Sequence, residues 1–246
     1  MSGIFGERAK EAVLSLLFPR RCPVCGEIVM PKGQRICPPC VKQLDFVREP
    51  RCMKCGRSID EETSRYCHSC ETRERHFERN LALLFYDDRM RRAMAAVKYH
   101  HKKEYLAPLG HLLALKFSEE LCRFGADCLL PVPLHSARRR ARGFNQAEEL
   151  ALELAREIEL PLYTDVLLRE KKTVAQKSLG ADARIRNLTA AFRAEAERIR
   201  ERKIRRVILV DDIYTTGSTL EACSRVLRAA GVEKLICVCL CIVPEE

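Results

Sequence analysis

The chain has 246 residues and a formal net charge of +10, from 44 Lys and Arg against 34 Asp and Glu. This length bounds the protein to one or two domains and leaves enough chain to bury a substantial core. Its apolar runs all fall short of the roughly 20 residues that a bilayer span needs, so we expect no membrane insertion. The basic balance favours nucleic acid or phosphorylated ligands as partners.

Residues 1–18 predict a small amphipathic helix, in which Phe5 and Val13 are apolar and Glu7 and Lys10 are charged. Charges interrupt this segment too often for a signal peptide, and no small-residue cleavage site follows it. We therefore expect a cytoplasmic protein.

Eight of the 14 cysteines form two copies of one pattern, each with two Cys-x-x-Cys pairs. Four thiolates make the tetrahedral ligand set of a structural zinc ion, and such a closed site leaves no place for a catalytic water. The sequence therefore predicts two structural Zn²⁺ sites in a double zinc ribbon. The predicted ligands are Cys22, Cys25, Cys37 and Cys40 in the first copy, and Cys52, Cys55, Cys67 and Cys70 in the second.

Two ways of sharing the metal ions fit this spacing. The close repeat favours two sequential ribbons, whereas a cross-braced arrangement would let the first Cys-x-x-Cys pair share a metal with the third. Iron–sulfur binding is a minor alternative. We interpret His68 as a bystander, because four sulfur ligands already close the second site.

The other six cysteines lie in apolar helix or strand contexts, which indicates reduced thiols in the core. The last three alternate along the final strand, so we expect them on one of its faces. These six residues are Cys122, Cys128, Cys223, Cys237, Cys239 and Cys241.

The composition changes after Cys70, and we place a domain boundary near residue 75. The N-terminal helix and the zinc-binding unit then cover residues 1–75, and an α/β domain covers residues 76–246. The apolar pattern of this second domain predicts a first strand and two helices, over residues 80–86, 89–99 and 104–124. Basic residues 98–103 could face either a pyrophosphate or water.

Residues 127–135 predict a short buried strand that prolines interrupt, and a cationic loop over residues 136–143 follows it. This loop would give the sheet edge an anion site, with Arg142 as the arginine that faces the ligand. For residues 138–140 a solvated basic surface is an equally good interpretation. Asn145 is placed to cap the next helix.

The segment between this helix and the strand at residue 207 is less regular. Residues 161–168 predict an extended segment, and residues 169–180 are polar and aperiodic, as expected for a mobile lid. A strand is expected over residues 188–192. The charge-rich residues 193–206 predict a solvated turn or a short helix.

The most informative segment joins a strand to a helix. Residues 207–210 predict a buried parallel strand, and Asp211 and Asp212 follow at the edge where ligands of open α/β sheets bind. Hydroxyl and N–H groups then meet at a helix N-terminus, where a phosphate is favoured. An ordinary helix cap would explain one hydroxyl, but not four beside a pair of carboxylates. The groups belong to Thr215, Thr216, Gly217, Ser218 and Thr219.

This loop resembles the loop of the type I phosphoribosyltransferases that binds phosphoribosyl pyrophosphate (PRPP), together with Mg²⁺. In that family two acidic residues hold the ribose hydroxyls, and the Thr-Thr-Gly-Ser-Thr segment wraps the 5′-phosphate. The resemblance implies that Asp211 and Asp212 are catalytic, and that a lid with Thr173, Gln176 and Lys177 closes over PRPP. It also implies that PRPP contacts Pro133, Leu134, His135, Arg142 and Arg184.

The paired Cys₄ units, the Pro-Val-Pro-Leu-His segment at 131–135 and the Arg-Gly-Phe-Asn-Gln segment at 142–146 together resemble the ComF family, or ComFC/GntX group. The resemblance covers residues 16–244. It implies a type I phosphoribosyltransferase fold, a mostly parallel sheet flanked by helices, with a small N-terminal zinc-ribbon domain. It further implies a role in DNA uptake during natural transformation, with other uptake proteins as partners.

Two classes of function remain open from the sequence. As an enzyme, the protein would displace pyrophosphate from C1′ of PRPP. As a non-catalytic binding module, it would hold single-stranded DNA at the same anion sites. The sequence contains no recognisable general base or acceptor pocket, and Phe144 and Tyr214 are the only obvious stacking residues near the site.

Overall fold

The computed structural model describes residues 19–60, 64–170 and 181–244, without the side chains of residues 181–184. The predicted helix over residues 1–18 lies outside the described residues. So do the lid residues Thr173, Gln176 and Lys177, and the side chain of Arg184. Within the described residues, no helix is long and apolar enough to cross a bilayer.

A four-stranded parallel sheet forms the centre of the molecule, with strand order β1-β6-β5-β2. Its strands are buried along nearly their whole length because helices cover both faces, as parallel sheets require. This arrangement confirms the predicted fold class. The strands are β1 (Asn80–Phe85), β2 (Cys128–Pro131), β5 (Arg206–Tyr214) and β6 (Lys234–Ile242).

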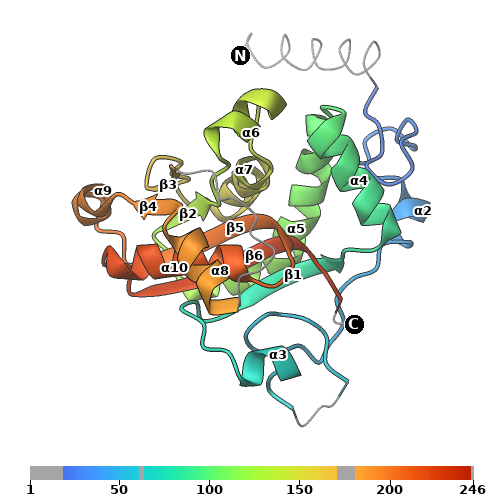
Figure 1. Ribbon diagram of the computed structural model, residues 1–246. Helices are drawn as coiled ribbons and strands as arrows, with labels where there is room; N and C mark the ends of the chain where they lie inside the picture. Colours follow the sequence, from blue (N-terminus) through green and yellow to red (C-terminus); the bar gives the residue numbers. More distant parts are fainter. Residues whose placement is uncertain (1–18, 61–63, 171–180, 245–246) are drawn as a thin grey trace.

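Helices cover the two faces of the sheet as separate layers (Figure 1). One face carries α4 (Asp88–Tyr99), the short 3₁₀ helix η1 (Lys103–Tyr105), α5 (Leu106–Phe124) and α7 (Gln146–Ile158). The other face carries α8 (Ala181–Thr189) and α10 (Ser218–Ala229). The helices over residues 89–99 and 104–124 and the strand over residues 80–86 are therefore confirmed. Asn145 caps α7 as predicted, since its Oδ1 accepts the Ala147 N–H at 3.2 Å.

The strand expected over residues 188–192 is wrong. Leu188 lies in the last turn of α8, where the Thr189 hydroxyl donates to the Ile185 carbonyl at 2.8 Å. The strand β4 (Phe192–Ala194) begins only at Phe192 and pairs antiparallel with β3 (Leu167–Arg169) in a second, small sheet. A five-residue, mostly apolar segment fits a helix end and a strand equally well, and packing of Leu188 against the core decides here.

A short helix replaces the cationic loop that was expected after β2. Helix α6 (Ser136–Arg142) holds the arginines and ends at Gly143, whose φ of +83° suits a left-handed helix end. Another short helix, α9 (Ala196–Glu201), lies in the charge-rich segment, in agreement with the prediction of a turn or short helix there.

The two cysteine units pack against opposite faces of the sheet, although they are copies in sequence. Cys22 and Cys40 of the first unit, which contains α2 (Pro38–Val41), share a hydrophobic cluster with α4 and α5. All four cysteines of the second unit, which contains α3 (His68–Glu71), share the other cluster with α10. Figure 1 accordingly shows α2 beside α4, and α3 well away from it.

Two expectations for the remaining cysteines are wrong. Cys122 is exposed, because it follows the fully buried Leu121 and lies about 100° further around α5. Cys237 and Cys239 share one cluster, but Cys241 belongs to the other, so the three do not share a face. Cys128, Cys223 and the three strand cysteines are buried, as predicted.

Candidate functional site

A cavity of about 800 Å³ lies at the carboxyl edge of the parallel sheet. Segments that are far apart in sequence border it: the end of β5 with the start of α10, the β2–α6 connection with α6 and the start of α7, the end of α4, β3, and Tyr86 just after β1. The charged and hydroxyl-bearing residues of its lining are Lys98, Tyr86, Tyr99, Arg138, Arg142, Arg169, Asp211, Asp212, Thr215 and Thr219.

The turn between β5 and α10 is built around Gly217, which caps the helix with a φ of +74°. A Cβ atom on Gly217 would lie 2.3 Å from the Tyr214 hydroxyl oxygen, so the turn has room only for glycine. Thr216 and Ser218 hydrogen bond to each other through their hydroxyls at 2.8 Å. Thr215 and Thr219 border the cavity, and the helix offers its first N–H groups on this side.

The two aspartates differ in their surroundings. Asp211 Oδ1 accepts the Asp212 N–H at 2.8 Å, and Asp212 Oδ2 lies 2.6 Å from Lys98 Nζ. Burial, together with the negative charge of Asp212, raises the pKa of Asp211 well above its usual value. Asp211 is thus held in place by the backbone, whereas Asp212 is paired with a cation from α4.

The β2–α6 connection brings part of its predicted contacts to the cavity. Pro133 and Leu134 line it, whereas His135 caps α6 by accepting the Ala137 N–H through Nδ1 at 3.2 Å. Arg142 also lines the cavity, and its Nη1 donates to Gln146 Oε1 at 2.5 Å. Burial lowers the pKa of Arg142, and the charge of Asp212 opposes this effect.

Three further cations lie at the cavity, and the sequence had left two of them, Lys98 and Arg138, open between a ligand and water. Lys98 ends α4 in the basic segment that could have faced a ligand or water, and Arg138 is on α6. Arg169 ends β3, and its guanidinium lies 5.1 Å from the centre of the Phe192 ring. Burial and the like charge of Arg138 lower the pKa of Arg169. Lys98, Arg138 and Arg169 therefore add positive charge to the lining of one cavity, where an anion would be favoured.

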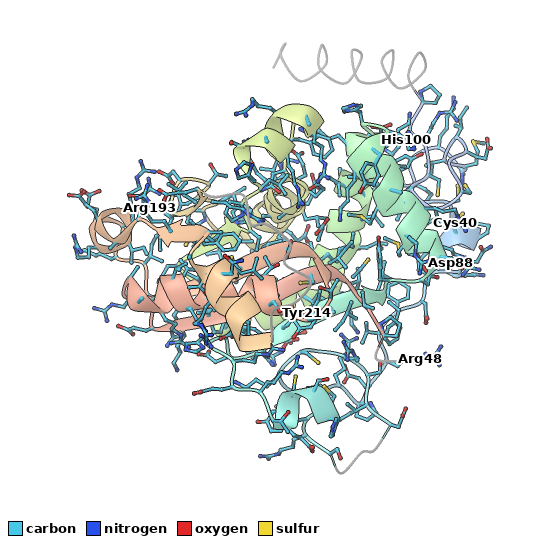
Figure 2. All side chains as sticks on the ribbon, in the orientation of Figure 1. Cys40, Arg48, Asp88, His100, Arg193 and Tyr214 are labelled. Atoms are coloured by element: carbon cyan, nitrogen blue, oxygen red, sulfur yellow. The ribbon has the colours of Figure 1, made fainter. Side chains whose placement is uncertain are left out.

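The expected stacking residues are also different. Phe144 and Tyr214 are only 8% and 3% exposed, so they are core residues and offer no ring face to a ligand. Tyr86 and Tyr99 line the cavity instead, and Tyr99 is 73% exposed. In the sequence, Tyr99 stands beside Lys98 at the end of a predicted helix. This position does not reveal that the end of the helix lies at the cavity. In Figure 2, Tyr214 is labelled near the sheet, and His100 near the end of α4.

Each cysteine unit brings four sulfur atoms to within 4.8 Å of one another. The groups are Cys22, Cys25, Cys37 and Cys40, and separately Cys52, Cys55, Cys67 and Cys70. This grouping of the sulfur atoms fits the sequential arrangement and not the cross-braced one. Gly26 and Gly56 turn the chain with positive φ, and each donates its N–H to the backbone carbonyl oxygen of the first cysteine of its unit, Cys22 or Cys52, at 2.9 Å. Both sets fit a closed, structural Zn²⁺ site.

Comparison with known proteins agrees with both halves of the chain. The model of the double zinc ribbon domain matches residues 13–71, and that of the phosphoribosyl transferase domain matches residues 141–246.

Competence protein F of Haemophilus influenzae is 31% identical over 222 residues, which cover 89% of this chain and 95% of the relative. Competence protein ComFC of Bacillus subtilis is 29% identical over 207 residues, 80% of each chain. The DNA utilization protein YhgH of Escherichia coli K12 is 29% identical over 71% of this chain and 77% of its own. The chain therefore belongs to the ComF family, in which a double zinc ribbon accompanies a domain of the phosphoribosyltransferase type.

Proposed function

We propose that this protein binds PRPP, or another ligand with a 5-phosphoribosyl group, together with Mg²⁺, and that it acts in DNA uptake. One observation carries the proposal: a carboxylate pair and the N-terminus of a twelve-residue helix border the same cavity. Carboxylates accept hydrogen bonds from a diol, and helix N–H groups donate to a phosphate. A ribose 5-phosphate presents these two groups on one small molecule.

The positive side of the cavity gives a place for the pyrophosphate of PRPP. Arg138, Arg142 and Arg169 would surround it, and an anion there would relieve the repulsion between Arg138 and Arg169. Bound Mg²⁺ would neutralise part of the phosphate charge, since this ion is held by one or two carboxylates together with substrate phosphates. Asp211 and Asp212 are the carboxylates of the cavity that suit this role.

In a transfer reaction the bond between C1′ and the pyrophosphate oxygen breaks, and a bond from C1′ to an acceptor forms. Positive charge develops on the ribose as the leaving group departs, and the two aspartates would stabilise it. The arginines would stabilise the negative charge that accumulates on the pyrophosphate. The acceptor would enter beside Tyr99, which lines the cavity and is 73% exposed.

The exposed ring of Tyr99 favours a second candidate function, the binding of single-stranded DNA without turnover. Bases stack on exposed aromatic rings. The arginines of the cavity and the loop of residues 214–219 would hold the sugar-phosphate backbone of the DNA. The names of the relatives, competence protein and DNA utilization protein, agree with either function.

Thermal unfolding with PRPP and Mg²⁺ tests the proposal. A ligand at a hundred times its Kd stabilises the folded state by about 2.7 kcal/mol, so Tm should rise by several degrees. The double variant Asp211→Asn, Asp212→Asn should lose this rise, whereas Asp88→Asn, an exposed acid on α4, should keep it. An equal rise in the double variant would refute the assignment of the ribose contacts.

Two further measurements separate the candidate functions. Release of pyrophosphate from PRPP, tested against a panel of amine and base acceptors, identifies an enzyme if release depends on the acceptor. Binding of single-stranded DNA with a steep salt dependence and no pyrophosphate release identifies the binding module.

A further inference from the structure

The second cysteine unit lies next to residues 214–219, which we call the phosphate loop. The first unit lies against the other face of the sheet. A second cavity, of about 400 Å³, separates the second unit from this loop. Cys55, Cys70 and Arg75 line it from one side, and Tyr214 and Thr216 from the other. The two zinc sites therefore have different neighbours, although their ligand patterns are the same.

Arg75 makes the most direct link between the second unit and the loop. Its Nη2 donates to the Thr216 carbonyl at 3.0 Å, and the residue is only 8% exposed. The guanidinium also lies 5.9 Å from the centre of the Phe77 ring. Because Arg75 binds the main chain of the turn, it fixes the peptide groups next to those that would face a phosphate.

Tyr214 forms the floor of the loop. Its ring lies against Gly217, and its neighbours on the other side include Cys55 and Cys70. The side chain is 3% exposed, so it has little room to move while the second unit stays in place. A shift of this unit would reach the loop through Tyr214 as well as through Arg75.

The segment that carries Arg75 is held at both ends. Beyond it, the His76 N–H donates to Glu221 Oε2 at 2.9 Å, and His76 Nδ1 lies 2.6 Å from Glu221 Oε1, at the start of α10. Asn80 Nδ2 donates to the Cys55 carbonyl at 2.9 Å. A Cβ on Gly56 would lie 2.2 Å from the Asn80 carbonyl oxygen, which shows how closely the ribbon meets β1. The N-terminal end of the segment that carries Arg75 is Cys70, a predicted zinc ligand.

We propose that the second zinc site, and not the first, positions the phosphate loop, with Arg75 as the positioning residue. Structural zinc holds together units that have too little apolar core to fold alone. Without metal at Cys52, Cys55, Cys67 and Cys70, the chain leading to Arg75 would lose its fixed end, and Arg75 would release Thr216. Whether this release weakens the binding of a phosphate ligand depends on the proposed function. Whether it disorders the phosphate loop does not.

Arg75→Met tests the contact in the zinc-loaded protein. We expect amide order parameters of residues 215–217, measured by NMR without ligand, to fall from about 0.85 to below 0.6, while those of α7 stay unchanged. Arg75→Lys keeps the charge and a donor and should restore part of the order. Arg228→Met is the matched control, because Arg228 donates to the His76 carbonyl in the same segment but not to the loop. An ordered loop in Arg75→Met would overturn the proposal.

Paired cysteine variants test the difference between the two zinc sites. Cys55→Ser with Cys70→Ser, and Cys25→Ser with Cys40→Ser, should each lower the zinc content from two ions per chain to one. Only the pair in the second unit should disorder residues 215–217. Equal disorder in both, or in neither, would contradict the proposal. If the second pair does not fold, the Arg75→Met result decides alone.

Affinity for PRPP with Mg²⁺ separates this inference from the proposed function. We expect Arg75→Met to weaken binding by roughly tenfold or more, the usual effect of losing a hydrogen bond from a charged donor. If the parent protein does not bind PRPP while Arg75→Met still disorders the loop, the proposed function is wrong and the positioning role stands. If the parent binds PRPP and the variant binds it equally well with an ordered loop, the positioning role is wrong.

Discussion

Lys98 Nζ lies 2.6 Å from Asp212 Oδ2, and both side chains are mostly buried, 21% and 15% exposed. One of the two acids assigned to the ribose is therefore already paired with a cation of the protein. Asp212 keeps its Oδ1 for a ligand hydroxyl, and Lys98 lies where it would also meet the phosphates of a bound ligand. The positive charge of Lys98 offsets part of the electrostatic repulsion between the two adjacent carboxylates.

Lys98→Met should lower the free energy of unfolding by about 1–3 kcal/mol, because it leaves Asp212 unpaired beside Asp211. It should also weaken the binding of PRPP. Denaturant titration measures the first effect. Lys102→Met is the control, since its ion pair with Glu104 is exposed and should be worth roughly 0–1 kcal/mol. Equal losses in the two variants would show that the Lys98 pair has no special role.

Asp211 should make stability depend on pH in the direction opposite to most carboxylates. Its pKa is raised in the folded state, so the folded protein binds a proton that the unfolded chain loses near the usual value of 3.8. The free energy of unfolding should fall as pH rises from that value to the raised pKa. Asp211→Asn should remove this fall and raise Tm at neutral pH, while PRPP binding is lost. A lower Tm in Asp211→Asn at neutral pH would refute this account of the burial.

Gly217→Ala should disrupt the phosphate loop, because the added Cβ meets the Tyr214 hydroxyl at a φ of +74°. We expect a loss of about 1–3 kcal/mol in the free energy of unfolding, together with loss of PRPP binding. Gly231→Ala separates the two causes, since Gly231 has a φ of +106° and nothing within 4 Å of the added atom. If Gly217→Ala and Gly231→Ala both bind PRPP like the parent protein, the contact with Tyr214 has no role in PRPP binding.

Tyr99→Ala tests whether the exposed ring holds a base. Stacking on one aromatic ring is worth about 1–3 kcal/mol per base, so the affinity for single-stranded DNA should fall about five- to 150-fold. Tyr99→Phe should bind like the parent, because it keeps the ring. An abasic strand should bind the parent and Tyr99→Ala equally well. Unchanged DNA affinity in Tyr99→Ala would exclude stacking on this residue.

The sequence predicted the elements whose signals are local. The strand of residues 207–210, Gly217 and the carboxylate pair are neighbours in sequence, and so are the members of each Cys-x-x-Cys pair. Their residue types alone indicate a buried strand, a helix cap and a metal site. The cap at Asn145 was likewise readable from the residues next to it.

Contacts between distant segments could not be predicted in the same way. Arg75 and Thr216 are 141 residues apart, and only the packing of the second unit on the sheet brings them together. Lys98 belongs to a basic segment that, from the sequence, could face either a pyrophosphate or water, and only the direction of α4 places it at the cavity. The strands β3 and β4 are too short to show an alternating pattern. Leu188 belongs to α8 and packs, partly buried, against the hydrophobic cluster on that face of the sheet.

A crystal structure with PRPP and Mg²⁺ bound tests the central claim most directly. We predict that the ribose hydroxyls lie within hydrogen-bond distance of Asp211 and Asp212, with the 5′-phosphate at the N–H groups of residues 215–219. A ligand whose diol lies away from both aspartates, or whose 5′-phosphate lies outside this loop, would contradict the account.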